Sequence, residues 1–404
     1  MWPALNARTR AAPTSRWAVT RVTLSNESAD STASEVSAAF RAITLPLRAL
    51  GLPLVPLTEP ATASTRKICP LVGLVIFAYA VRLLVAFFAR EHDLSSFRVL
   101  LALGHIFRSF TSFLSVVHFC LHYRLLNEVV TKIRAIFDAY SHIAKLARFI
   151  KLLSAFCVVC AFVLWPALLM NAFMQNKAYP YAHYDNGIRA VLVFIDTFLL
   201  SLSKTLSSFI IVLFVGLCYM LSNSTLRFML TLESEFTNAR AFEIKAVRKA
   251  LLRLSRISDV ANALNRTYGA ILSWWYAEFT ASFLLGVPSC IVAVSGGAQF
   301  SEYAFSLVDL LRDMTVFMTM TFVASEMAKN VSDSLHYALR VTNTIEDRNV
   351  DLNFALLLEN LVCHIEDAKV ELSGAEFFHV DRALINRVLL LVSTFAIILY
   401  QFLS

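Results

Sequence analysis

The sequence predicts an all-α, polytopic membrane protein with seven transmembrane helices, a cytosolic N-terminus and an extracellular C-terminus. Three observations predict this class: 57% of the 404 residues are apolar, they gather in long blocks, and Lys and Arg gather in every second connection between the blocks. A soluble chain of this length would divide into domains of mixed composition. The net charge of +7 does not indicate a nucleic-acid partner, because the positive residues are spread between the blocks and form no single patch.

Residues 1–67 predict a disordered cytosolic tail. They are rich in Ala, Ser, Thr, Arg and Pro and contain no long apolar run. Such a segment cannot bury enough apolar surface to fold. A cleaved secretory signal would need an apolar core segment, whereas the Arg, Ser and Ala bias before Glu27 is also found in mitochondrial transit peptides. An uncleaved tail is the preferred interpretation.

Each of the apolar blocks is long enough to cross a bilayer, which takes about 20 helical residues. The fourth block exceeds this length, so it must tilt or extend beyond the membrane. The blocks are Ile68–Ala89, Val99–His122, Phe149–Met174, Ile188–Leu221, Tyr268–Val294, Tyr303–Met327 and Ala383–Leu403.

The positive charges set the orientation of the chain. The tail and the second, fourth and sixth connections hold 26 of the 36 Lys and Arg residues, so these segments are predicted to be cytosolic. Seven crossings then place the C-terminus outside. This arrangement excludes a G-protein-coupled receptor, which has the opposite topology, and the Asp/Glu-Arg-Tyr and Asn-Pro-x-x-Tyr motifs of that class are absent.

Two cytosolic connections predict amphipathic helices. In the loop 224–266, apolar residues from Ile244 to Leu264 recur at steps of three and four with basic residues between them; a helix lying on anionic lipid is the alternative there. In the segment 328–382, Phe354 to Leu372 keeps a strict spacing of four and three. The predicted organisation is therefore a tail (1–67), a six-helix membrane bundle (68–327), a cytosolic helical segment (328–382) and a seventh membrane helix (383–404).

Polar residues inside the blocks indicate a ligand site, because charges within a membrane are costly unless they face a cavity or a partner. The outer halves of the third, fourth and sixth blocks predict an aromatic-walled pocket between helices three to six, with Trp165, Asn171, Asp196, Asp309 and Arg312 as candidate ligand-binding residues. A purely structural ion-pair cluster at Asp309, Arg312 and Asp313 is the competing interpretation. Lys204 can pair with a carboxylate, while Arg82 and Arg108 have no partner that the sequence identifies.

The chain carries no sequence motif of an enzyme or of a cofactor site. A Gly-rich phosphate loop, a metal-ligand spacing and a nucleophile elbow are all missing from the sequence. The cysteines form no pair in a predicted outer loop, so no structural disulfide is expected. The sequence predicts neither catalysis nor a cofactor or metal.

The last helix carries the most specific motif. Thr394 and Phe395 are followed by five mostly apolar residues and then by Gln401 and Phe402. This ending resembles the C-terminal signature of insect gustatory receptors, Thr-Tyr, five hydrophobic residues, Gln-Phe. The segment from Ser373 to Arg382 is similar to the lead-in of the same family, although Phe395 replaces the usual Tyr.

The resemblance implies a ligand-gated, non-selective cation channel of the cell membrane, assembled as a homotetramer or as a heteromer with other gustatory receptors. Each subunit would hold its own pocket for a small-molecule tastant and give its seventh helix to a central pore, while the helices of 328–382 would anchor the tetramer. The pore and gate residues would be Thr394, Ile397, Ile398, Gln401 and Phe402. An odorant-type receptor subunit of the same superfamily and a polytopic transporter are the alternatives; the transporter class is disfavoured by the lack of a visible internal repeat. Ala396 stands where sweet-taste receptors carry Glu, which favours a bitter or another tastant.

Overall fold

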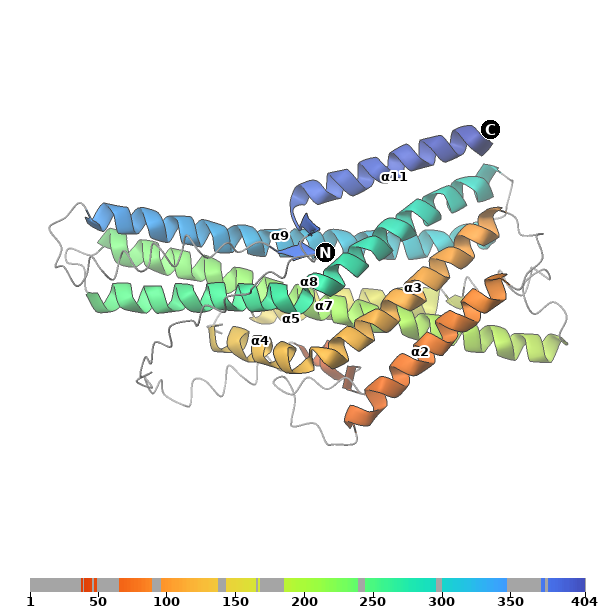
Figure 1. The fold of residues 1–404 in the computed structure, drawn as a ribbon, viewed down its shortest axis with the longest axis horizontal. Helices are drawn as coiled ribbons and strands as arrows, with labels where there is room; N and C mark the ends of the chain where they lie inside the picture. The colour runs from red at the N-terminus through yellow and green to blue at the C-terminus, as the bar shows by residue number, and fades with distance from the viewer. Residues whose placement is uncertain are drawn as a thin grey trace, which may run out of the picture.

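The computed structural model is nearly all helical, and its long helices lie side by side in a bundle (Figure 1). The structure describes residues 38, 40–45, 47–48, 65–88, 96–136, 143–164, 166–167, 185–238, 244–295, 300–346, 372–374 and 377–403. Within these residues the helices are α2 (Thr65–Phe88), α3 (Ser96–Leu121), α4 (Tyr123–Ile136), α5 (Ile143–Val158), the π-helix η2 (Val159–Leu164), α7 (Asn186–Asn238), α8 (Ile244–Ser295), α9 (Phe300–Glu346) and α11 (Arg382–Leu403).

Every predicted apolar block coincides with a helix in the described part of the chain. Consecutive long helices run in alternate directions: α2, α8 and α11 end at the end of the bundle where α3, α7 and α9 begin (Figure 1). By length and composition, three described stretches are long and apolar enough to cross a membrane: Ala144–Leu164, Ala190–Leu230 and Leu252–Ile291. The full count of seven crossings and the sides of the two termini stay predictions.

Helix α7 forms the centre of the bundle. From Leu206 to Leu221 every side chain except that of Tyr219 is buried, and α7 packs against α3, α5, α8 and α9. A helix that is apolar on all its faces must lie inside a protein or a membrane. Its burial among four neighbours explains why the stretch from Phe209 to Leu221 has no polar face.

Helices α7, α8 and α9 are much longer than a membrane span. They contain 53, 52 and 47 residues, whereas about 20 residues cross a bilayer core. The excess of α8 includes the amphipathic stretch that begins at Ile244, and its apolar residues Leu254, Ile257, Ala261 and Leu264 are buried. That stretch is therefore helical, as predicted, and its apolar face packs inside the bundle. The second predicted amphipathic stretch begins at Phe354 and lies outside the described residues, except for its last residue, Leu372.

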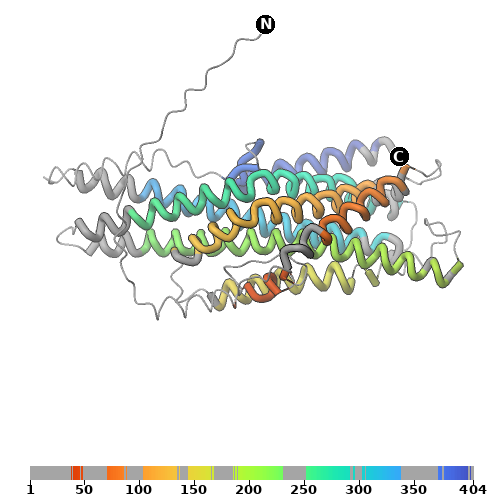
Figure 2. Tube along the Cα trace, turned by 60° about the horizontal axis from the view of Figure 1, so that its bottom comes forward, coloured from red at the N-terminus to blue at the C-terminus, as the bar shows by residue number. Residues whose placement is uncertain are grey.

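One part of the predicted disordered tail is folded. Residues 40–45 are helical, and Phe40, Ile43 and Leu47 are fully buried in the core. Their spacing of three and four places all three on one helix face. A Cβ atom at Gly216 of α7 would lie 2.7 Å from the Phe40 ring, so the glycine makes room for this contact (Figure 2 shows the segment against the bundle). The prediction of disorder for 1–67 is wrong at these residues, because their short apolar stripe was hidden by the surrounding composition.

A short hairpin leads into α11. Strand β1 (Ser373–Gly374) pairs antiparallel with β2 (Phe378–His379), and Gly374 lies so close to the Phe378 ring that a Cβ atom there would be 2.4 Å from it. Asp381 caps α11, since the Leu384 amide donates a 2.8 Å hydrogen bond to its carboxylate. The hairpin and the cap together fix the direction in which α11 leaves the bundle.

The cysteines differ from the prediction at one position. Cys120, near the end of α3, is disulfide-bonded, so the expectation that the chain has no disulfide is wrong. The four other cysteines whose side chains the structure describes are free: Cys157, Cys160, Cys218 and Cys290.

Candidate functional site

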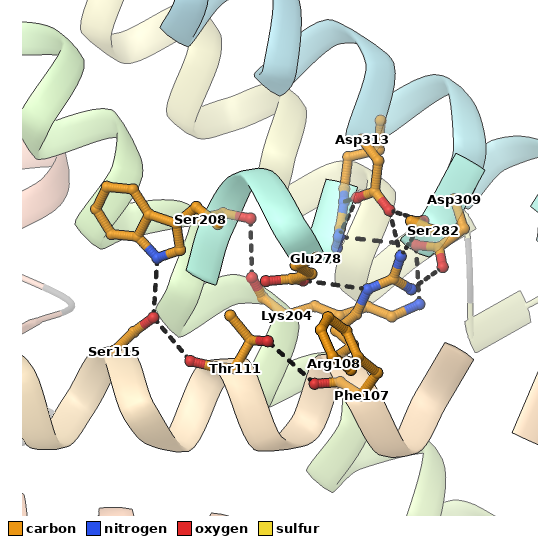
Figure 3. Close-up of polar contacts among 12 residues, drawn as sticks. Phe107, Arg108, Thr111, Ser115, Lys204, Ser208, Glu278, Ser282, Asp309 and Asp313 are labelled. Carbon is orange, nitrogen blue, oxygen red and sulfur yellow. Dashed lines mark hydrogen bonds and ion pairs between the residues drawn. The ribbon is translucent and has the colours of Figure 1, made fainter. Parts of the chain in front are cut away.

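Six charged side chains from four helices meet inside the bundle (Figure 3). They are Arg108 of α3, Lys204 of α7, Glu278 of α8, and Asp309, Arg312 and Asp313 of α9, which we call the charge cluster. The side chain of Asp309 is the most exposed of the six, at 12%. Ionised groups this deeply buried require partners, because each loses most of its hydration.

Arg108 is the centre of the charge cluster. Its guanidinium forms ion pairs with Asp309 and Asp313, lies 3.5 Å from Glu278, and donates a 2.7 Å hydrogen bond to the Ser282 hydroxyl (Figure 3). Ser282 in turn donates a 2.5 Å hydrogen bond to Asp313. One side chain of α3 therefore ties α8 to α9.

Two further cations complete the charge cluster. The Lys204 ammonium lies 2.9 Å from Asp309, and the Arg312 guanidinium lies 2.5 Å from Asp313 and 3.8 Å from Asp309. Asp309 thus faces three cations. Removing one partner from such a buried set costs about 3–5 kcal/mol, because it leaves an uncompensated charge behind.

A polar stripe on α3 continues from the charge cluster along the interior of the bundle. Thr111 and Ser115 follow Arg108 at steps of three and four, so they share its face. The Trp275 indole donates a 2.9 Å hydrogen bond to Ser115, and both hydroxyls donate to carbonyls one turn earlier. These bonds hold α3 in register with α8.

A cavity of about 40 Å³, which opens to solvent on one side, lies between α3, α8 and α9. Most of its lining residues are small or polar. Gly286 keeps the space open, because a Cβ atom there would lie 3.2 Å from Leu310. Charged groups of the cluster form one wall. The lining residues are Gly104, His105, Arg108, Ser282, Leu285, Gly286, Ser289, Ser306, Asp309 and Leu310.

The structure separates the predicted ligand-binding residues. Asp309 lines the cavity, and Arg312 contacts Asp309 from within the charge cluster. Asp196 lies elsewhere: it pairs with Arg82 of α2 and is not among the lining residues. Trp165 and Asn171 lie outside the described residues. Of the candidates that the structure describes, Asp309 lines this cavity and Asp196 does not, and the shared ligand pocket of all five residues stays a prediction.

The cavity also differs from the predicted one in its walls. No Phe, Tyr or Trp is among its described lining residues. The aromatic side chains of α8 and α9 pack on one another instead, with the Phe317 ring in edge-on contact with Tyr276, Phe279 and Phe283. The prediction from the sequence also missed α3, which contributes His105 and Arg108. The stripe of Arg108, Thr111 and Ser115 within an apolar block is the pattern that could have identified it.

The predicted pore residues lie in the C-terminal half of α11, where every described side chain from Ser393 on except that of Ala396 is exposed. Leu384, Ile385, Val388 and Val392 pack toward α8 and α9, whereas Thr394, Ile397, Ile398 and Gln401 are exposed. Thr394 donates a 2.8 Å hydrogen bond to the Leu390 carbonyl. The structure describes Phe402 as helical but not its side chain. The stripe is thus uncovered in a single chain.

A polar contact joins α9 to the start of α11. Arg382 pairs with Glu326, and its guanidinium carbon lies 5.8 Å from the centre of the Phe322 ring. The cluster residues Asp309 and Asp313 are on the same helix as Glu326, about four to five turns before it. A rigid displacement of α9 at the cavity would therefore reach α11.

Comparison with solved structures identifies the fold. No protein-family model matches the chain, and no curated protein matches it. The structure of the insect olfactory receptor OR5 from Machilis hrabei is similar, with a TM-score of 0.68 at 11% identity, over 84% of this chain and 90% of that one. The same receptor in complex with eugenol gives a TM-score of 0.69 at 13% identity, over 90% and 97% of the two chains. The chain has the fold of insect olfactory receptors.

Proposed function

We propose that the chain is a chemoreceptor subunit, a gustatory receptor that acts as a ligand-gated, non-selective cation channel in the cell membrane. The observation that carries the proposal is the uncovered stripe on α11, because it holds the Thr394 to Phe402 motif that resembles the gustatory receptor ending. In a homotetramer, four copies of this stripe would surround one axis and line a pore. The fold similarity to an olfactory receptor supports the same superfamily.

In this proposal the ligand binds in the cavity between α3, α8 and α9. One olfactory receptor of this fold is described in complex with a small molecule, eugenol, which supports a small-molecule ligand here as well. Asp309 links the cavity to the charge cluster, and α9 links the cluster to the start of α11 through Glu326 and Arg382. Ligand binding would shift α9 and thereby the population of open pores.

An odorant-type receptor channel is the second candidate. The fold similarity to olfactory receptors favours it, while the Gln401-Phe402 ending favours the gustatory branch. The two candidates differ in ligand and share the channel mechanism.

Calcium imaging and current recordings test both candidates together. Cells that express the chain alone are exposed to a panel of non-volatile tastants, bitter compounds included, and to a panel of volatile odorants. The gustatory proposal predicts cation influx evoked by a tastant; influx evoked only by odorants selects the second candidate. Absence of ligand-evoked and of basal current, with the chain at the cell surface, contradicts the channel proposal.

A further inference from the structure

The wall of the cavity is electrically balanced. The charge cluster contains three cations and three carboxylates, so its formal charges cancel. Transfer of a proton from Lys204 to Glu278 would leave this sum at zero. Each carboxylate already lies within 3.5 Å of a cation. The cluster therefore has no excess charge with which to attract an ion from the cavity.

A fully charged ligand group would meet an unfavourable environment at this wall. The ligand group would lose hydration on entering the cavity. It would find no unpaired opposite charge there, because each charged side chain of the cluster already lies in an ion pair within the cluster. If the ligand displaced Arg108 or Asp309 from its ion pair, another charged member of the cluster would be left without its partner. The balance of charges selects against both cations and anions.

The cavity nevertheless offers hydrogen bonds. The Ser306 hydroxyl lines it, is 7% exposed, and forms no hydrogen bond to another described residue. A buried hydroxyl without a hydrogen-bond partner costs free energy, so a bound molecule that forms a hydrogen bond with it is stabilised. Leu285 and Leu310 give the opposite character, an apolar surface without donors or acceptors.

We propose that the cavity selects an uncharged small molecule that places a hydroxyl group against Ser306 and Asp309 and its apolar part against Leu285 and Leu310. A hydroxyl both donates and accepts, so it can donate to the Asp309 carboxylate while it accepts from Ser306. This inference rests on the proposed function in one respect, that this cavity is where the ligand binds.

A matched series of three probes tests the selection. Benzyl alcohol, benzylamine and benzoate share a ring and differ in charge at neutral pH. Their binding to the full chain in lipid nanodiscs is measured by saturation-transfer NMR titration. The same titrations use Ser306→Leu, which fills the cavity and removes the hydroxyl, and Ser295→Ala, a control that removes an exposed hydroxyl at the end of α8.

The expected result is that benzyl alcohol binds at least about tenfold more tightly than either charged probe, a difference of about 1.4 kcal/mol. This preference should disappear in Ser306→Leu and persist in Ser295→Ala. Equal cavity-dependent binding of a charged probe, or no cavity-dependent binding of the alcohol, overturns the inference.

Two charge variants extend the test. Glu278→Gln leaves the cluster with one excess positive charge, so the affinity for benzoate should rise about tenfold; Arg312→Gln does the reverse and should favour benzylamine by a similar factor. Unchanged affinities in folded variants contradict the electrostatic argument. Because these measurements need no current, a chain that binds the alcohol but does not conduct would contradict the channel proposal and leave this inference intact.

Discussion

Asp309 is the residue at which the cavity and the charge cluster meet, because it lines the first and pairs with cations of the second. We expect Asp309→Asn to raise the half-maximal concentration of an agonist from the ligand panels at least about tenfold, as loss of one charge-assisted contact costs on the order of 1.5–3 kcal/mol. Calcium imaging at equal surface expression measures this. The matched control is Asp196→Asn, whose carboxylate pairs with Arg82 away from the cavity and should leave the response unchanged.

The competing interpretation, that the charge cluster is purely structural, has its own outcome at the residue scale. If Asp309→Asn fails to reach the surface, the ion pairs are needed for folding, and Ser306→Ala then tests the cavity without touching an ion pair. Ser306→Ala should weaken the response by about the value of one neutral hydrogen bond, roughly threefold to tenfold. Wild-type responses from both variants would remove the cavity from ligand binding.

At the scale of elements, the Glu326–Arg382 pair is the contact that couples α9 to α11. Both side chains are partly exposed, so the pair contributes up to about 1 kcal/mol, or about a fivefold change in agonist sensitivity. Glu326→Arg and Arg382→Glu should each change sensitivity by that order, and the double exchange should restore it, as a double-mutant cycle of dose–response curves measures. Lys132→Glu, which breaks the exposed Glu128 pair within α4, is the control. Additive effects of the two exchanges would contradict the coupling.

The sequence predicts the helices themselves but not the contacts between them. The long apolar blocks and the amphipathic start of α8 are periodic patterns, so each was predicted as a helix and is one. The partners of Arg108 depend on contacts between residues about 170 to 205 positions apart, which no local pattern contains. Asp196 and Asp309 were placed together from their depth along two helices, but rotation about the helix axes, which depth does not give, directs them to different partners. Phe40 was missed because a single helical turn among prolines carries too little periodicity.

At the scale of the whole molecule, the distribution of Lys and Arg predicts which end of the bundle faces the cytosol. An epitope tag at the C-terminus should be labelled on intact cells, and a tag at the N-terminus only after permeabilisation, because the basic segments stay inside. Antibody labelling of the two tagged chains measures this. The reverse pattern would place the cavity and the end of α11 on the wrong side of the membrane for a receptor of external ligands.

The measurement that tests the central claim most directly is ion permeation through a channel altered only at Gln401. The account places four copies of this amide in the pore, where the α11 stripe carries no carboxylate, so Gln401→Glu would add a ring of negative charge there. Recordings of reversal potential with calcium or sodium outside give the divalent-to-monovalent permeability ratio. We expect this ratio to rise in Gln401→Glu relative to the wild-type chain and to stay unchanged in Thr131→Ser, a substitution at an exposed position of α4. Conducting Gln401→Glu channels with the wild-type ratio would contradict the assignment of α11 to the pore.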